Sequence, residues 1–188
     1  MLIQPNYQKI FSSFPTIELA RIRLREMRDS DAEAYYNYIN NPDVKAFVPN
    51  DCVPNSVAIA MSDLRYYRSN FENQIGVSWA IADLRTDKII GTLGLTMLKF
   101  LQRKANISYD IDYNHWNNGY AKEAIAGALD FTDRVLQLSR VQANIATHND
   151  RSRKLAERFG FKKEGTMQKF DMLLGKMVDF DIYARIKS

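Results

Sequence analysis

The amino-acid sequence predicts a mixed α/β (α+β) fold, in which helices flank a central, mostly antiparallel sheet. In the middle of the chain, consecutive segments alternate apolar and polar residues, as half-buried strands do. Segments with helical spacing of apolar residues precede and follow these strands. No repeat, low-complexity tract or Pro/Gly-rich linker divides the 188 residues, a length typical of one domain. We therefore expect a single domain over residues 1–188, with residues 1–15 as an N-terminal extension.

The N-terminal third predicts one strand followed by two helices. Residues 16–27 alternate as a strand does. A helix is expected next, because Ser30 and Glu33 have the spacing of a capping box. Pro42 ends it, since the residue before a proline disfavours helical torsions. A second helix is expected at about residues 56–68. Its buried side should hold Val57, Met61 and Leu64.

The rest of the chain predicts strands and helices in alternation, closed by a hairpin. Strand-forming residues alternate most clearly in three consecutive segments, and the longest helical pattern follows them. The expected order is strands at 77–81, 88–98 and 107–113, a helix at 119–136, a strand at 140–146, a helix at 152–159, and strands from 161 onward that turn at 174–176.

The charge of the chain does not favour a nucleic-acid partner. Lys and Arg number 26 against 22 Asp and Glu, a formal net charge of +4. The basic residues are scattered along the sequence, and the nearest approach to a run, at residues 151–154, is interrupted by Ser152. Scattered charge is typical of a solvated surface, so we expect no specific nucleic-acid binding.

The sequence also predicts a soluble cytoplasmic protein without a metal. The longest apolar stretch, residues 89–101, is broken by Lys99 and is too short to cross a bilayer. The first nine residues show no secretory signal pattern, so we expect a cytoplasmic protein with no membrane partner. Cys52, His115 and His148 have no metal-ligand spacing, so no metal is expected.

The segment that predicts chemistry joins a strand to the long helix. The alternation ends at Tyr113, and Asn118-Gly119-Tyr120-Ala121 then opens the helix. The first N–H groups of a helix lack intrahelical partners and carry the positive end of its dipole. A glycine there lets an anion approach, which makes the segment a candidate phosphate site. An ordinary tight turn at Gly119 is the structural alternative.

Residues 116–124, Trp-Asn-Asn-Gly-Tyr-Ala-Lys-Glu-Ala, resemble a motif of a known family. The segment is similar to the Trp-Gly-Lys-Gly-Tyr-Ala-Thr-Glu-Ala segment of RimJ/RimL-type N-acetyltransferases of the GNAT superfamily. In that family it is a variant of the loop that binds the coenzyme A pyrophosphate. The resemblance therefore implies a GNAT-like fold and acetyl-CoA as cosubstrate.

Four further segments are similar to the family in the same order, so that the resemblance spans about residues 16–186. They are residues 20–25 with 31–32, residues 90–95, residues 149–152 followed by 160–165, and the hairpin residues Gly175, Asp179 and Tyr183.

The sequence departs from the family pattern at several positions. Asn117 and Asn118 stand where Gly and Lys are usual, which removes a cation from the phosphate loop and implies weaker coenzyme binding. Asn106 stands where relatives often carry a Glu that serves as a base. Ala156 replaces the tyrosine acid that many GNAT enzymes place four residues before their Gly-Phe pair.

The resemblance implies roles for individual residues. The backbone of Ile111, Asp112 and Tyr113 would hold the pantetheine arm, with an N–H near Ile111 as oxyanion donor. The Ser152 hydroxyl would give a proton to the sulfur and Asn149 would bind the pantetheine; Tyr113 is the second proton-donor candidate. Residue types alone leave Ser152 equally suited to capping a helix. The full set of coenzyme contacts is expected to be Ile111, Asp112, Tyr113, Trp116, Asn118, Gly119, Tyr120, Ala121, Lys122, Asn149 and Ser152.

The general base stays open at this level. Asp110, Asp112 and His115 flank the site, but strand alternation turns Asp110 and Asp112 away from the face that carries Tyr109. A water chain is the alternative.

The sequence thus predicts an acetyl-CoA-dependent N-acetyltransferase that transfers an acetyl group directly to a primary amine. The acceptor is either a protein N-terminal amine or a small-molecule amine, and the protein a monomer or a homodimer. The alternative is a catalytically idle, coenzyme-A-binding regulatory module.

Overall fold

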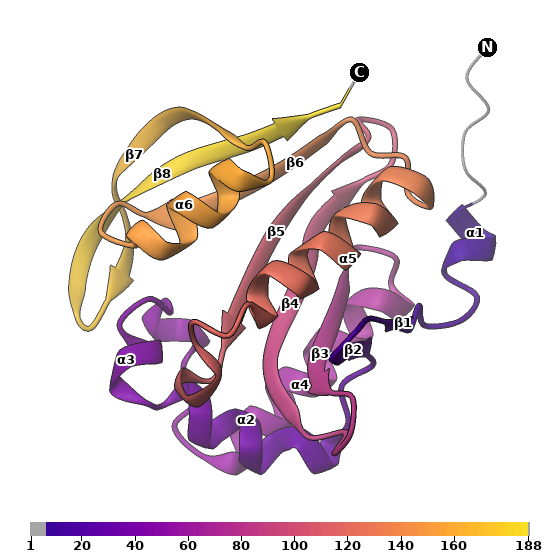
Figure 1. Ribbon diagram of the computed structural model, residues 1–188. Coiled ribbons are helices and arrows are strands. Elements are labelled where there is room, and N and C mark those ends of the chain that lie inside the picture. The colour runs from indigo at the N-terminus through magenta and orange to yellow at the C-terminus, as the bar shows by residue number, and fades with distance from the viewer. Residues whose placement is uncertain (1–6, 188) are drawn as a thin grey trace.

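The computed structural model describes residues 7–187, which form one eight-stranded sheet in the order β1-β2-β3-β4-β5-β6-β8-β7 (Figure 1). Neighbouring strands are antiparallel except for β5 and β6, which are parallel. This confirms the expected mixed and mostly antiparallel sheet. The strands are β1 (Ile17–Glu18), β2 (Ile22–Arg25), β3 (Val77–Asp83), β4 (Ile89–Lys99), β5 (Lys104–Ile111), β6 (Arg140–Ala146), β7 (Lys162–Leu173) and β8 (Lys176–Ile186).

Helices cover both faces of the sheet. In Figure 1, α5 and α6 lie in front of the strands, whereas α2 and α4 lie behind them. The apolar residues divide accordingly into a larger core under α5 and a smaller one under α2 and α4. The helices are α1 (Tyr7–Ile10), α2 (Ala32–Ile39), α3 (Pro42–Lys45), α4 (Val57–Glu72), α5 (Tyr120–Arg134) and α6 (Asp150–Arg158).

The strands β5 and β6 pair over three residues only and then separate. Their register runs from Lys104 opposite Arg140 to Asn106 opposite Gln142. Beyond that point the C-terminal half of β5 stays on β4, whereas β6 continues with β8. The sheet therefore opens into two arms, which Figure 1 shows diverging below the top of the molecule.

The opening exposes backbone groups on one edge of β5. The Asp112 N–H donates to the Ile90 carbonyl at 2.8 Å, so the backbone groups of Asp112 face β4. Successive residues of a strand direct these groups to opposite sides. The backbone groups of Ile111 and Tyr109 therefore face the gap.

Residues 7–15 pack against the sheet. The Trp79 indole, fully buried, donates from Nε1 to the Pro15 carbonyl at 2.6 Å. Phe11 and Phe14 each lie 4.9 Å from the ring of Phe71. The described part of the expected N-terminal extension thus packs against the core as partly buried residues; residues 1–6 lie outside the described residues.

Residues 17–25 form two strands where the sequence predicted one. The chain turns after β1, and β2 pairs back on it with Ile17 opposite Leu24. The first helix that the sequence predicted, α2, begins after Asp31 instead of Ser30, and a short 3-10 turn at Asp29–Asp31 precedes it. The cause is the Asp31 carboxylate, which accepts from the Arg28 N–H at 2.8 Å and pairs with the buried Arg25 guanidinium at 2.8 Å.

Two other boundaries differ from prediction. The helix α4 starts after its N-cap Ser56, as expected, but continues to Glu72. Its buried face holds Leu64 as expected, whereas Val57 is exposed because the first turn points to solvent. The strand β5 ends at Ile111, and Tyr113 lies in a 3-10 turn over Tyr113–His115.

Candidate active site

Two cavities meet at the gap between β5 and β6. The inner cavity, of about 340 Å³, is lined from α2, α4 and the strands by residues that include Tyr35, Tyr67 and Thr92. The outer cleft, of about 510 Å³, lies between the start of α5 and α6. Six residues line both: Phe47, Val48, Tyr109, Asp110, Asn149 and Ser152. The fold thus joins two separate entrances at one junction.

The outer cleft is bordered by the glycine-led start of α5. Gly119 is the N-cap, with a left-handed φ of 81°, a conformation that favours glycine. A Cβ at Gly119 would have one neighbour within 4 Å, the guanidinium end of Arg21 at 3.5 Å. Backbone conformation requires the glycine, therefore, and the space beside it stays open for an anion at the helix N-terminus.

Arg21 fixes this loop, a role that the sequence did not reveal. Its guanidinium donates to the Asn118 carbonyl at 2.8 Å and pairs with Glu123 at 2.8 Å. It also lies over the ring of Tyr120, 4.6 Å from the centroid. The turn between β1 and β2 is thereby tied to the first turn of α5.

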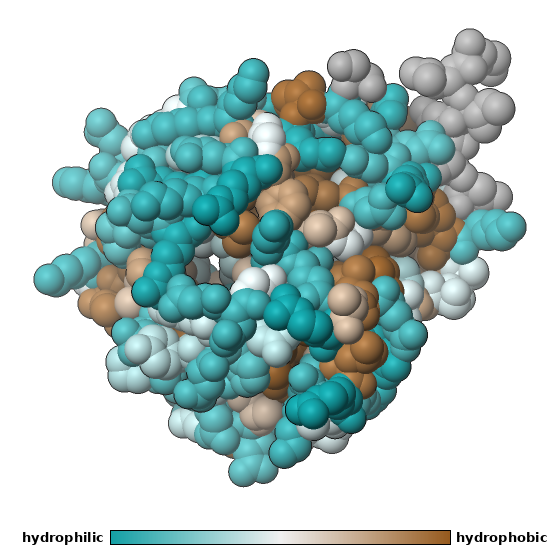
Figure 2. All heavy atoms as spheres, viewed as in Figure 1, coloured by the Kyte–Doolittle hydropathy of each residue, from teal (hydrophilic) through white to brown (hydrophobic). Residues whose placement is uncertain are grey.

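Basic side chains of α5 and α6 line the outer cleft. Lys122 comes from the first turn of α5, and Arg151, Lys154 and Arg158 come from α6. Arg151 lies over Trp116, 4.7 Å from the ring centroid. The cation that Asn118 lacks is thus replaced from another helix. Figure 2 shows the hollow on this face ringed mostly by hydrophilic side chains.

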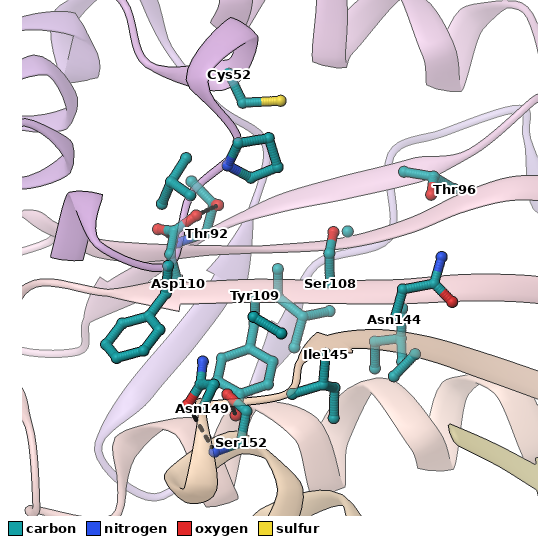
Figure 3. A pocket seen from close by; sticks show the side chains of 18 of the residues that line it. Cys52, Thr92, Thr96, Ser108, Tyr109, Asp110, Asn144, Ile145, Asn149 and Ser152 are labelled. Carbon is teal, nitrogen blue, oxygen red and sulfur yellow. Dashed lines mark hydrogen bonds between the residues drawn. The ribbon is translucent and has the colours of Figure 1, made fainter. Parts of the chain in front are cut away.

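A pair of hydroxyl groups lies at the junction. The Tyr109 and Ser152 hydroxyl oxygens are 2.9 Å apart. Asn149 caps α6, because its Oδ1 accepts from the Ser152 N–H at 3.1 Å (Figure 3). Ser152 is therefore not the cap, and its hydroxyl faces Tyr109 instead. Burial raises the pKa of Tyr109 more than the Ser152 hydrogen bond lowers it, which keeps the phenol protonated at neutral pH.

The sequence reasoning did not single out Tyr109. Its alternation with Ile107 and Ile111 indicated a core position, and nothing local linked it to Ser152. Tyr113, the second proton-donor candidate, is 45% exposed and packs on Trp116 with ring centroids 5.2 Å apart. It lines neither cavity, because β5 ends two residues earlier.

The structure separates the expected coenzyme residues into two groups. Eight of them line the outer cleft: Ile111, Trp116, Gly119, Tyr120, Ala121, Lys122, Asn149 and Ser152. Asp112, Tyr113 and Asn118 do not. Asp112 instead accepts from the Asn114 N–H at 3.1 Å and shapes the turn, while Asn118 donates to the Trp116 carbonyl at 3.1 Å.

Trp116 also acts on the edge of β5. Its indole Nε1 donates to the Ile111 carbonyl at 2.7 Å. This bond occupies the Ile111 carbonyl, which faces the gap. The Ile111 N–H is therefore the backbone group of this residue that is available to a ligand.

Asp110 is a half-buried carboxyl group at the junction. It accepts from the Tyr38 hydroxyl at 2.7 Å, the Thr92 hydroxyl at 2.6 Å and the Thr92 N–H at 3.1 Å. Burial raises the pKa of Asp110, and these bonds oppose the rise. Alternation correctly predicted that Asp110 and Tyr109 point to opposite faces of β5, as Figure 3 shows. Asp110 still belongs to the site, because the inner cavity opens on the face to which it points.

Two cavities that meet at one pair of hydroxyl groups, one of them lined by cations, are compatible with a transferase that brings two substrates together. The profile described as Acetyltransferase (GNAT) domain matches residues 21–162, so the chain belongs to the GNAT acetyltransferase family. The chain is an N-acetyltransferase, as its curated relatives are named, and it shares its fold with the solved structures of RimJ and RimL.

Comparisons with individual proteins agree. The uncharacterized N-acetyltransferase YoaA of Bacillus subtilis is 32% identical over 93% of this chain and 98% of its own. RimJ of Mycobacterium smegmatis, solved in complex with CoA-disulfide, has a TM-score of 0.84 at 20% identity, covering 98% of this chain and 90% of its own. RimL, a ribosomal L7/L12 alpha-N-protein acetyltransferase solved with coenzyme A, has a TM-score of 0.82 at 19% identity, covering 92% and 98%.

Two kinds of feature are absent from residues 7–187, a membrane-spanning helix and a metal-binding cluster. No helix in this range is long and apolar enough to span a membrane. No group of three or more His, Cys, Asp or Glu side chains in the same range is arranged to hold a metal ion.

Proposed function

We propose that this protein transfers the acetyl group of acetyl-CoA directly to a primary amine. The observation that carries the proposal is the junction at Tyr109 and Ser152, where a cation-lined cleft meets a second cavity. Direct transfer needs both reactants at one point from two sides. The coenzyme A bound by the related RimJ and RimL structures supports the choice of donor.

The outer cleft suits the phosphates and the arm of the coenzyme. The open N-terminus of α5 at Gly119 offers backbone N–H donors, and Lys122, Arg151 and Lys154 offer positive charge. The arm would then follow the gap-facing edge of β5 toward Ser152. When bound, acetyl-CoA supplies an acetyl group activated as a thioester.

The chain's residues would assist a simple exchange of bonds. The amine nitrogen forms a bond to the acetyl carbonyl carbon, the carbon–sulfur bond breaks, the amine loses a proton and the sulfur gains one. The Ile111 N–H would stabilise the negative charge that develops on the carbonyl oxygen. The Ser152 hydroxyl would donate the proton to sulfur, and Tyr109, protonated at neutral pH, would replace it.

The acceptor is proposed to enter through the inner cavity. The related RimL acts on a protein N-terminus, by its name, which supports a peptide amine, and the cavity volume of about 340 Å³ also accommodates a small amine. The geometry of residues 7–187 does not favour the idle module, because two hydroxyls and a carboxyl group converge where the cavities meet.

Turnover assays test the proposal. The purified protein is incubated with acetyl-CoA and a panel of peptides and small amines, and acetylated product and released thiol are both measured. We expect equal amounts of the two with at least one amine. Tight acetyl-CoA binding without any product would favour the idle module, and absence of binding would remove the coenzyme assignment.

A further inference from the structure

The two cavities differ in charge. Four basic side chains line the outer cleft, where we place the coenzyme phosphates. The inner cavity is lined by two acids, Asp110 and Asp171, and the lining residues within 7–187 include no Lys, Arg or His. The basic side chains that give the chain its net positive charge therefore do not line the cavity proposed for the acceptor. A positively charged acceptor would be attracted to this cavity and a negatively charged one repelled.

Asp110 is the acid at the junction itself. Its three hydrogen-bond donors, from Tyr38 and Thr92, are all neutral groups. Asp110 has no salt-bridge partner among residues 7–187, whereas the two fully buried acids of this range, Asp31 and Asp181, are paired with Arg25 and Lys163. Burying an unpaired carboxylate is unfavourable unless a cation joins it.

The carboxylate also retains room for a ligand. A carboxylate has about four acceptor positions, and three are occupied. The Oδ1 atom accepts two hydrogen bonds, whereas Oδ2 accepts one, from the Thr92 hydroxyl. An ammonium N–H can therefore bind Oδ2 without displacing Tyr38 or Thr92.

The backbone holds Asp110 in place. A Cβ at Gly91, on the adjacent strand β4, would lie 2.3 Å from the Asp110 carbonyl oxygen, so β4 and β5 approach very closely there. Tyr109 and Asp110 are neighbours on β5 and point to opposite faces, yet both line the two cavities (Figure 3). Asp110 thus faces the acceptor side of the junction and Tyr109 the sulfur side.

We propose that Asp110 binds the acceptor as an ammonium ion and accepts its proton, which selects cationic primary amines that carry no carboxylate beside the amine. This inference rests on the proposed function. Oδ2 of Asp110 first takes one proton from the ammonium group, which frees the lone pair of the nitrogen. The nitrogen then bonds to the acetyl carbon, the carbon–sulfur bond breaks, and the second proton that leaves the nitrogen balances the one that the sulfur gains. A carboxylate next to the amine would meet Asp110 at close range and be repelled.

The titratable groups around Asp110 are compatible with this role. Tyr35 and Tyr38 from α2 and Tyr67 from α4 interact electrostatically with it, and burial raises the pKa of each phenol. They remain neutral near pH 7. Asp110 is then the group in this cluster that exchanges a proton.

The first experiment uses the unaltered protein and two acceptors that differ by one carboxylate, 2-phenylethylamine and L-phenylalanine. We expect kcat/KM to be at least 10-fold higher for 2-phenylethylamine, although its amine is the more basic and less of it is in the free form. The tripeptide Ala-Ala-Ala and spermidine are assayed beside them, and their ratio distinguishes a peptide from a small-molecule source.

The second experiment compares Asp110→Asn with Asp130→Asn. Asp130 pairs with Arg134 on the exposed surface of α5 and serves as the matched control, since both variants lose one carboxylate. For the best acceptor, Asp110→Asn should lower kcat/KM at least 10-fold and Asp130→Asn less than twofold. Acetyl-CoA affinity should stay within twofold in both. The preference for 2-phenylethylamine over L-phenylalanine should disappear in Asp110→Asn.

The outcomes separate the two proposals. If the unaltered protein acetylates no amine in the panel, the proposed function fails. If it acetylates 2-phenylethylamine and L-phenylalanine equally well, or if folded Asp110→Asn keeps its acceptor kinetics, the inference about Asp110 fails and the proposed function stands. Should Asp110→Asn not fold, the comparison of acceptors on the unaltered protein still decides.

Discussion

The hydroxyl oxygen of Tyr109, on β5, lies 2.9 Å from that of Ser152, on α6. The two residues are on opposite arms of the opened sheet, so their contact bridges the gap where the cavities meet. A short chain of hydroxyl groups at this point can deliver a proton to a leaving sulfur.

Removing either hydroxyl should slow the reaction. We expect Ser152→Ala to lower kcat about 10- to 1000-fold, since general acids contribute about 10²–10⁴ and a thiolate leaves fairly well unaided. Tyr109→Phe should lower kcat by a smaller factor, because Ser152 would still face the sulfur. Acetyl-CoA affinity, measured by calorimetry, should change little in both.

The double variant tests whether the two hydroxyls act as one relay. If they do, Ser152→Ala combined with Tyr109→Phe should be no slower than Ser152→Ala alone, because groups acting as a unit are not additive. If the reductions in kcat of the two single variants instead multiply in the double variant, the two hydroxyls act independently. A Ser152→Ala enzyme with normal kcat would leave Ser152 without a catalytic role.

Gly119 should be essential for the coenzyme. Gly119→Val adds a branched side chain where backbone N–H groups meet the phosphates, so we expect acetyl-CoA affinity to fall at least 100-fold. Gly175 is the control, because its φ of 76° is also left-handed and a Cβ there meets nothing within 4 Å. Gly175→Val should show similar backbone strain and unchanged acetyl-CoA affinity. Equal affinity in the two variants would contradict the phosphate site.

The cations of α6 should set the salt dependence of coenzyme binding. Lys154→Glu and Arg158→Glu should each raise the acetyl-CoA Kd about 10-fold at low salt, with a smaller effect at 0.5 M salt, because screening weakens the attraction. Lys176→Glu, on the exposed start of β8, should leave the Kd unchanged. Identical Kd values for all three variants would argue that the backbone of α5 alone holds the phosphates.

Cys52 should react slowly with alkylating agents despite its place on the inner cavity. Although Cys52 is an exposed residue, partial desolvation of its thiol and the nearby Asp51 carboxylate raise the pKa of Cys52 to about 11. Because the raised pKa disfavours the thiolate, only about one molecule in a thousand carries it at pH 8. Iodoacetamide modification, followed by mass spectrometry, should accelerate about tenfold per pH unit from pH 8 to 10. A rate matching that of N-acetylcysteine at pH 8 would contradict this.

The sequence by itself indicated the order of the elements from β3 to β8 and the glycine that opens α5. Alternation identified β3, β4 and β6 within two residues at most ends, since each of these strands has one pattern of burial. Gly119 was found because the strand–turn–helix signal is local and its left-handed backbone depends on one residue. The predicted start of α2 was wrong because an ion pair between Asp31 and Arg25 shapes the turn that precedes this helix.

Only the tertiary structure decided the chemistry of the junction. Tyr109 and Ser152 are 43 positions apart, and Tyr38 and Asp110 are 72 apart, so no local pattern connects either pair. The basic residues of α6 reach the phosphate loop of α5 for the same reason. The first and third relationships follow from the separation of β5 from β6, which brings α6 to one edge of β5, and the second follows from the packing of α2 against the sheet. Propensity and periodicity act over a few residues, whereas this opening is set by how distant strands pair.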